Sequence, residues 1–280
     1  MSSLRYTLSY ENIEMELRLV KINNLHLHEE IQPELLEKLV KNLQKEKTIR
    51  HPIMVDRNSF VVLDGTHRIE ALKTLNFNHI PACMVDYMNH NIKLAFWYRT
   101  IKANKSRDLL SILQKIDVKM KKLKGSEKDE SSKKALISFA SGESFLLFEG
   151  AKKITVYKYL KEIEKKIRDS GFKINYDAKE DAFRKLKEKK SVAILAAPPL
   201  TKEAVIKTAL SREKFPCKAT RHIIPARPMG INFPLKYLKN PLICANKKFV
   251  EILNKKRLKV IPAGSSINSR KYEESIILFQ

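Results

Sequence analysis

Hydrophobic residues in the first hundred positions recur at two spacings, which predict alternating strands and helices. The segment that begins at Pro33 places leucines at helical spacing, and Ile69, Leu72 and Leu75 repeat that spacing. Short apolar or alternating runs predict strands at residues 16–22, 53–55, 61–63 and 80–85. This order of elements predicts a small α/β domain, in which ligands bind at the ends of strands.

The strand before Asp64 breaks at one glycine and is followed by a helix. Gly65 allows a sharp turn, and Thr66 is in position to cap the helix. A helix N-terminus carries free backbone N–H groups and a partial positive charge, so Asp64, Thr66, His67 and Arg68 are placed to hold a phosphate. An ordinary turn, with Asp64 and Thr66 as caps and Arg68 in solvent, fits the same pattern.

The second half of the chain also predicts mixed α/β structure. Strands are expected at residues 145–148 and 192–197, and helices at residues 155–167 and 201–210. Between residues 115 and 134 the composition turns to Lys, Glu, Asp and Ser without aromatic residues, which is typical of a solvated helix or linker. We therefore expect an α+β protein with two domains, residues 1–105 and residues 106–280.

Charge and composition narrow the classes of partner. The 280 residues include 55 Lys and Arg against 31 Asp and Glu, a formal charge of +24, which favours contact with nucleic acid, nucleotides or acidic surfaces. Much of this excess is lysine in segments that suit solvated helix faces. The 7 glycines form neither GxGxxG nor a Walker A pattern, which argues against an ordinary Rossmann or P-loop nucleotide site.

Targeting and cysteine signals are weak. No apolar run is long enough to cross a bilayer, and the first eleven residues lack the apolar core of a signal peptide. The three cysteines are widely separated and form neither a disulfide framework nor a CxxC metal site. A cytoplasmic protein without membrane contact is expected.

Two polar clusters are candidates for chemistry. Residues 26–30 (His-Leu-His-Glu-Glu) lack a third ligand at a zinc spacing, so Glu29 or Glu30 is considered as a general base instead, with a polar loop as the plain alternative. Residues 218–228 contain a hydroxyl, a guanidinium and an imidazole in succession, a combination that grips a carboxylate or phosphate. Trp97, the only tryptophan, is a candidate wall of the same pocket.

Taken together, these segments resemble the ParB/sulfiredoxin-like fold and, within it, the free L-serine kinases. The matching segments are Leu27-His28-Glu29, Arg50-His51-Pro52-Ile53, Leu63-Asp64-Gly65-Thr66-His67-Arg68 with Glu70-Ala71-Leu72-Lys73, and Thr220-Arg221-His222. The first-domain signals are shared broadly by ParB-like proteins, whereas the Leu-His-Glu and Thr-Arg-His segments point more narrowly to the kinases. Sulfiredoxin uses a cysteine before His-Arg where this chain has Thr66, so a thiol mechanism lacks its nucleophile.

The resemblance implies phosphoryl transfer from ADP or ATP to the hydroxyl of free serine, with Mg²⁺, giving O-phosphoserine for cysteine biosynthesis. It implies a ParB/sulfiredoxin-like N-terminal domain, a second mixed α/β domain and an active site in the cleft between them. Glu29 is then the catalytic carboxylate and Asp64 the metal ligand. The residues implied to bind the nucleotide are Arg50, His51, Asp64, Gly65, Thr66, His67 and Arg68. Those implied to hold the amino acid are Trp97, Thr220, Arg221 and His222.

A ParB-like DNA-binding or nucleotide-switch protein is the alternative. It rests on the charge and on residues 154–161, which look like the recognition helix of a helix-turn-helix. Simple amphipathicity, with Val156, Leu160 and Ile163 facing a core, explains the same pattern. Residues 144–148 favour a strand where such a motif needs a helix, so the kinase hypothesis is preferred.

Overall fold

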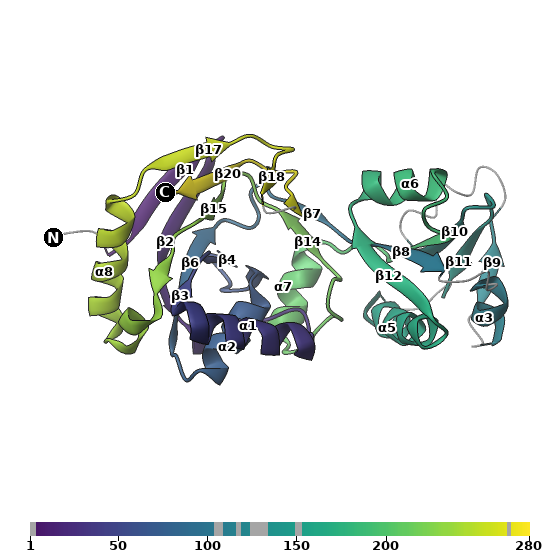
Figure 1. Cartoon of the computed structure of the whole chain (residues 1–280), viewed down its shortest axis with the longest axis horizontal. Helices are drawn as coiled ribbons and strands as arrows, with labels where there is room; N and C mark the ends of the chain where they lie inside the picture. Colours follow the sequence, from purple (N-terminus) through teal and green to yellow (C-terminus); the bar gives the residue numbers. More distant parts are fainter. Residues whose placement is uncertain (1–3, 104–108, 116–118, 124–133, 149–152, 268–269) are drawn as a thin grey trace. The chain divides into compact units, whose positions relative to one another are not determined.

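The computed structural model describes residues 4–103, 109–115, 119–123, 134–148, 153–267 and 270–280, and these form two compact units (Figure 1). Unit 1 contains residues 1–93, 202–214 and 222–280, whereas unit 2 contains residues 94–201 and 215–221. Both units are therefore assembled from segments that are not contiguous in the chain. No helix of the described residues is long and apolar enough to span a membrane.

Unit 1 is built on a five-stranded sheet. Its strands, in spatial order, are β1 (Tyr6–Tyr10), β2 (Ile13–Lys21), β6 (His79–Val85), β4 (Ile53–Asp56) and β5 (Val62–Asp64). Neighbours pair antiparallel except β4 and β6, which are parallel. In β2, apolar residues that are fully buried alternate with more exposed ones, whereas every residue of β4 is buried. The central strands are thus covered on both faces, and β5 ends at the sheet edge with Asp64.

Helices and short strands complete the first part of unit 1. Helices α1 (Pro33–Glu46) and α2 (Thr66–Thr74) contact each other, and α7 (Lys202–Leu210) returns to this unit from the second half of the chain. Strand β3 (Thr48–Ile49) pairs with β16 (Phe233–Pro234). Unit 1 also contains the short 3₁₀ helices η1 (Ile22–Asn24) and η3 (Leu235–Lys239).

The C-terminal residues form a second sheet in unit 1. Strand β20 (Ile276–Phe279) lies between β15 (Arg227–Met229), to which it is parallel, and β17 (Leu258–Ile261). Helix α8 (Leu242–Asn254) packs against β2, and the Asn246 side chain accepts a 2.9 Å hydrogen bond from the backbone N–H of Leu19. Strands β18 (Ser266–Ile267) and β19 (Arg270–Lys271) form a hairpin. These contacts join the two ends of the chain in one unit.

Unit 2 contains a six-stranded sheet with helices. The strand order is β12 (Phe172–Asp177), β8 (Tyr98–Ala103), β13 (Ala193–Ala196), β10 (Ala135–Phe139), β11 (Ser144–Leu147) and β9 (Met120–Lys122). The helices among its described residues are α3 (Leu109–Lys115), α5 (Lys153–Asp169) and α6 (Lys179–Lys187). Helix α5 places Val156, Tyr157, Leu160, Ile163 and Ile167 in the core. A further two-stranded sheet pairs β7 (Lys93–Ala95) with β14 (Arg221–Ile223).

The predicted α+β class is confirmed, and so is each element predicted around the Asp64 turn. The expected strand at residues 61–63 is β5 and the helix that follows is α2, but the predicted cap is wrong. Gly65 is the N-cap residue at φ +112°, Thr66 is the first helical residue, and no side chain caps the helix. The N-cap residue has a left-handed conformation, which favours glycine. Thr66 therefore lies one residue beyond the cap position, inside the helix. The predicted linker at residues 115–134 lies largely outside the described residues.

Candidate active site

The turn at Asp64 is fixed by the close approach of Gly65 to the sheet. A Cβ atom built on Gly65 would lie 2.4 Å from Cγ2 of Ile53, and the φ of +112° is one that other residues rarely adopt. Glycine therefore lets β5 pass directly into α2. As a result Asp64, at the end of β5, and Arg68, one turn into α2, lie side by side.

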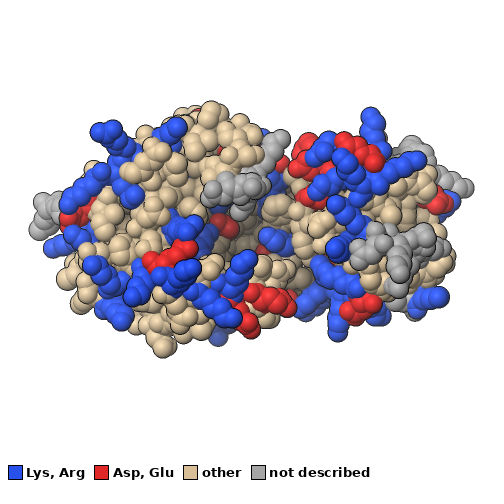
Figure 2. All heavy atoms as spheres, viewed as in Figure 1, with Lys and Arg blue, Asp and Glu red and all other residues tan. Residues whose placement is uncertain are grey.

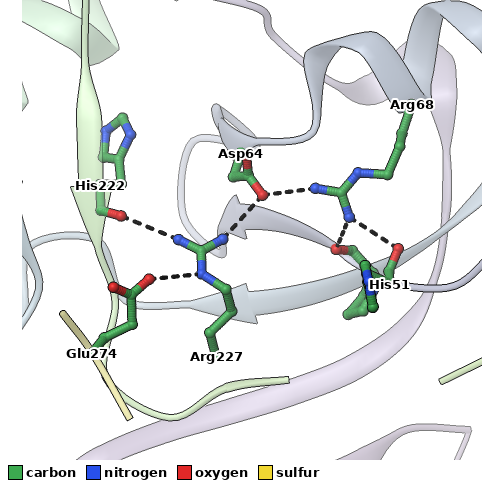
Figure 3. A network of polar contacts seen from close by, with 7 residues as sticks. His51, Asp64, Arg68, His222, Arg227 and Glu274 are labelled. Atoms are coloured by element: carbon green, nitrogen blue, oxygen red, sulfur yellow. Dashed lines mark hydrogen bonds and ion pairs between the residues drawn. The ribbon is translucent and has the colours of Figure 1, made fainter. Parts of the chain in front are cut away.

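An ionic network surrounds Asp64 (Figure 3). Its Oδ2 atom accepts hydrogen bonds from Nη2 of Arg68 at 2.7 Å and from Nη1 of Arg227 at 3.0 Å. Arg68 also donates through Nη1 to the backbone carbonyls of His51, at 3.0 Å, and Pro52. Arg68 thus joins the start of α2 to the segment before β4, while the Asp64 side chain stays 44% exposed.

Arg227 is a buried member of this network. Its guanidinium donates through Nε to Oε1 of Glu274 at 3.0 Å and through Nη2 to the His222 carbonyl at 3.1 Å, besides its bond to Asp64. Arg227 and Glu274 are each 8% exposed. Burial alone lowers the pKa of Arg227, but the Asp64 and Glu274 carboxylates outweigh it and raise the pKa.

Two histidines near the turn accept hydrogen bonds from the backbone. Nδ1 of His51 accepts from the N–H of Gly230 at 3.0 Å, and Nε2 of His67 accepts from the N–H of Gln32 at 2.9 Å. Burial, together with the charges of Arg68 and Arg50, lowers the pKa of His51 to about 4. His51 is therefore neutral at physiological pH, with its proton on the other ring nitrogen.

Glu29 lies between the sheet and helix α1, next to a buried histidine. Its side chain is 15% exposed, and Oε1 is 3.9 Å from Nε2 of His28. Burial lowers the pKa of His28, against the opposing effects of the Glu29 charge and of a hydrogen bond to the Val62 backbone. Glu29 therefore offers a carboxyl oxygen at a partly covered position, which suits a group that accepts a proton.

His222 belongs to a buried aromatic cluster in unit 1. Its Nε2 atom is 2.9 Å from the Tyr87 hydroxyl, and its ring stands edge to face with His28, at a centroid distance of 5.5 Å. A hydrogen bond to the Leu63 backbone also engages the ring, and burial lowers the pKa of His222 well below its usual value. The His222 imidazole is therefore neutral, and its ring is held by Tyr87 and by the Leu63 backbone.

Trp97, Thr220 and Arg221 belong to unit 2. The Arg221 guanidinium lies 4.8 Å from the Trp97 ring centroid, and the Lys218 ammonium lies 5.1 Å from it. The Trp97 carbonyl accepts a 2.8 Å hydrogen bond from Nη1 of Arg99, a buried arginine that is paired at 2.7 Å with Glu164. Cations over the tryptophan face form a positively charged surface suited to a carboxylate or phosphate.

The predicted site residues fall into three groups. His51, Asp64 and Arg68 share the network of unit 1, with Gly65 in the turn between the last two, and Glu29 and His222 lie beside His28. Trp97 and Arg221 contact each other in unit 2. Arg50 does not join the network: its exposed guanidinium makes two hydrogen bonds, at 2.7 and 2.9 Å, to the Glu46 carboxylate one helical turn away.

Sequence reasoning assigned no role to four residues that the structure places beside the predicted ones: His28, Tyr87, Arg227 and Glu274. Arg227 was in the polar segment that the sequence singled out, but its partners are 163 and 47 positions away. Tyr87 looks like an ordinary core aromatic in the sequence. Only a known pairing of the C-terminal strand with residues 227–229 would have pointed to Glu274.

Comparison with known proteins gives several matches, although no family model matches the chain. It is 31% identical over 231 residues to an ATP-dependent L-serine kinase of Staphylothermus marinus, a match that covers 79% of this chain and 90% of the relative. A ParB-like protein of Sulfolobus acidocaldarius is 27% identical, covering 74% and 90%. An ADP-dependent L-serine kinase of Thermococcus kodakarensis is 24% identical, covering 78% and 91%.

Solved structures agree on the fold. Two variants of a free serine kinase, one in complex with AMP and one with ADP, superpose with TM-scores of 0.68 and 0.67 at 20% and 19% identity. Each superposition covers 79% of this chain and 93% of the other. The predicted ParB/sulfiredoxin-like fold is confirmed by these likenesses.

Proposed function

This chain belongs to the L-serine kinase family, and we propose that it transfers the terminal phosphoryl group of ATP or ADP to the hydroxyl of free L-serine, giving O-phosphoserine. The observation that carries the proposal is the match to the Staphylothermus marinus kinase along nearly the whole of that enzyme. The relatives include one ATP-dependent and one ADP-dependent kinase, so both donors belong in the test. O-Phosphoserine made in this way would supply cysteine biosynthesis.

For the nucleotide we propose the turn from Asp64 to Arg68. Phosphoryl transfer depends on positioning and on cations or backbone N–H groups that neutralise the phosphate oxygens. The N-terminus of α2 supplies backbone N–H groups, and Arg68 supplies a cation fixed at a short distance from them. Solved nucleotide complexes of a free serine kinase with this fold support a nucleotide site in this chain.

Mg²⁺ fits the exposed carboxylate of Asp64. No group of three His, Cys, Asp or Glu side chains among the described residues is arranged to hold a metal ion. Magnesium does not need one, because it is commonly held by one or two carboxylates together with substrate phosphates and water. When bound with the nucleotide, the ion would neutralise charge on the phosphates, and Asp64 would be its protein ligand.

For the amino acid we propose Trp97, Thr220, Arg221 and His222. Arg221 and Lys218 offer positive charge beside the Trp97 ring, which suits the serine carboxylate. The His222 ring is bonded to the Tyr87 hydroxyl and to the Leu63 backbone, so the contribution of His222 is to hold its strand and the adjacent Tyr87 in place.

Glu29 is proposed as the general base. A free serine hydroxyl is a weak nucleophile at neutral pH, so a carboxylate that accepts its proton during attack on the terminal phosphorus accelerates transfer. The proton moves to a Glu29 oxygen as the new O–P bond forms and the bond to the leaving nucleotide breaks. Neutral His28 at 3.9 Å does not compete as a cation for that carboxylate.

The proposed kinase activity is tested by measuring turnover directly. Purified protein is incubated with Mg²⁺, L-serine and either ATP or ADP, and O-phosphoserine is followed by ³¹P nuclear magnetic resonance and mass spectrometry. Serine-dependent formation of the phosphoester with at least one donor is the expected result. L-Threonine and L-homoserine, offered in parallel, define the acceptor. Absence of phosphoester from folded protein with every donor and acceptor would overturn the proposal.

The helix-turn-helix that motivated the DNA-binding alternative is not present at residues 154–161. These residues lie in the 17-residue helix α5, which buries Val156, Leu160 and Ile163 in the core of unit 2 and follows a strand, β11. Lys and Arg side chains are scattered among acidic ones over the visible surface of both units and do not gather in a single patch (Figure 2).

A further inference from the structure

One guanidinium in unit 1 holds three segments that are distant in the sequence. Arg227, at the start of β15, contacts Asp64 at the end of β5, the His222 carbonyl in β14, and Glu274 before β20. Figure 3 shows these bonds radiating from Arg227, with Arg68 beyond Asp64. Asp64 belongs to the proposed phosphate turn, and His222 directly follows Thr220 and Arg221 of the proposed serine site.

The charges along this network alternate. Arg68, Asp64, Arg227 and Glu274 form a row of two cations and two carboxylates, joined by contacts of 2.7, 3.0 and 3.0 Å. A buried charge is costly unless it is paired and hydrogen-bonded, and Arg227 satisfies both needs through its planar fork. A lysine has one nitrogen in place of three and cannot reach all three acceptors at once.

We propose that Arg227 is a positioning residue for the kinase reaction, because it holds the Asp64 carboxylate and β14, the strand that carries Arg221 and His222 of the proposed serine site, in one fixed arrangement. This inference rests on the proposed function. Arg227 is buried and pairs with protein oxygens, so it acts through Asp64 and the His222 backbone. Its loss disturbs the binding of both substrates, whereas Arg221 serves the amino acid alone.

The experiment compares Arg227→Lys with variants of matched stability. Ile13 is a buried apolar residue of β2 and is not a member of the network, so Ile13→Val and Ile13→Ala give a graded loss of stability without removing a polar contact of the site. Each variant is assayed for kcat and for the KM of serine and of the nucleotide, and its urea midpoint is measured. Binding of ADP is measured by calorimetry, and binding of serine by the fluorescence of Trp97, the only tryptophan.

Arg227→Lys is expected to lower kcat/KM for both substrates by about 10- to 100-fold, the loss corresponding to one or two charge-assisted hydrogen bonds. The Ile13 variant of equal urea midpoint should keep both KM values within about twofold of wild type. Arg227→Ala, given methylguanidine, should regain activity as the concentration rises, whereas Ile13→Ala should not. A general loss of stability would not produce this rescue.

The proposal is overturned if Arg227→Lys keeps both KM values and kcat near wild type, or if the matched Ile13 variant loses as much. Should Arg227→Lys fail to fold, Glu274→Gln decides in its place: it keeps an oxygen for Nε but removes one charge, and unchanged kinetics would reject the inference. Wild-type protein that binds ADP and serine without making O-phosphoserine would refute the kinase proposal, and the variants' binding constants would still decide the role of Arg227. If wild-type protein shows neither binding nor turnover, the kinase proposal and the proposed role of Arg227 are both rejected.

Discussion

Glu29 and Glu30 are adjacent in the sequence, yet their substitution by glutamine is expected to change kcat to different extents. Glu29→Gln preserves the size of the side chain and removes the basic oxygen, so we expect kcat to fall by at least about 100-fold, because general-base catalysis contributes about 10²- to 10⁴-fold. The KM values of serine and nucleotide should change little. Steady-state kinetics of O-phosphoserine formation provides the measurement.

Glu30→Gln is the matched control, and it should retain most of the wild-type kcat. Loss of turnover in Glu30→Gln alone would assign the role of general base to Glu30 instead of Glu29. Two active variants would show that neither carboxylate accepts the serine proton.

Substitution of Arg221 is expected to change the KM of serine and not that of the nucleotide. Arg221→Ala removes the cation 4.8 Å from the Trp97 ring, so the KM of serine should rise by about 10-fold or more, as expected for a charge-assisted contact with a carboxylate. The nucleotide KM should stay close to wild type. A parallel titration of Trp97 fluorescence with serine reports the same loss as a binding constant, and equal effects on both substrates would contradict this assignment.

At the level of residues, the sequence predicted single side chains better than their partners. Asp64 and Arg68 were predicted to share a turn because they are four residues apart, and they form an ion pair. The contact of Arg227 with Asp64 depends on a pairing between distant segments, which no local pattern encodes. Arg50 was predicted to bind the nucleotide because it belongs to a recognised motif, and in the structure its guanidinium is hydrogen-bonded to the Glu46 carboxylate of α1.

Among the elements, the turn between β5 and α2 is the one most sensitive to substitution. Gly65→Ala places a methyl group 2.4 Å from Ile53 in a backbone conformation that is already unfavourable for alanine. We expect a loss of more than about 2 kcal/mol in the free energy of unfolding, above the cost of about 1 to 2 kcal/mol for a left-handed alanine alone. Urea denaturation measures this difference.

Gly264→Ala serves as the control for Gly65→Ala. Gly264 also has a positive φ, of +85°, but a Cβ there meets nothing within 4 Å. The Gly264→Ala variant should therefore lose only the free energy of unfolding that corresponds to placing alanine in a left-handed conformation. Equal losses in the two variants would mean that the contact with Ile53 relaxes without cost.

Element prediction succeeded where periodicity was strong. Residues 155–167 fall within α5 and residues 80–85 within β6, because each has a clear apolar pattern. The short strands β14, β15 and β20 carry only three or four residues each and were not predicted. Their pairing partners, rather than their own sequences, determine that they form strands.

For the whole molecule, three histidines, of which His28 and His222 are buried and His51 is partly buried, predict how stability depends on pH. The pKa of His51 is lowered to about 4, and burial also lowers the pKa values of His28 and His222, whereas an unfolded histidine has a pKa of about 6.5. The unfolded state therefore binds more protons between these values. Stability is full above about pH 6.5 and falls as the pH drops towards 4.

Urea midpoints at pH 7.5 and pH 5 test this expectation. His51→Asn retains an acceptor for the Gly230 N–H but does not titrate, so the midpoint should change less with pH than in wild type. His90→Asn, at an exposed histidine, should leave the pH dependence unchanged. A wild-type midpoint that is equal at both pH values would show that these histidines are protonated in the folded protein without cost.

The ion pair between Asp64 and Arg227 also has a consequence for the order of folding. It closes a loop of 163 residues, and such distant contacts form late because a long segment must lose its freedom first. Unit 2 consists largely of the intervening residues 94–201, so it is free to fold before the ends of unit 1 meet. Refolding monitored by Trp97 fluorescence should therefore finish before the phosphate turn becomes able to bind ADP, and added ADP should slow unfolding more than it speeds refolding.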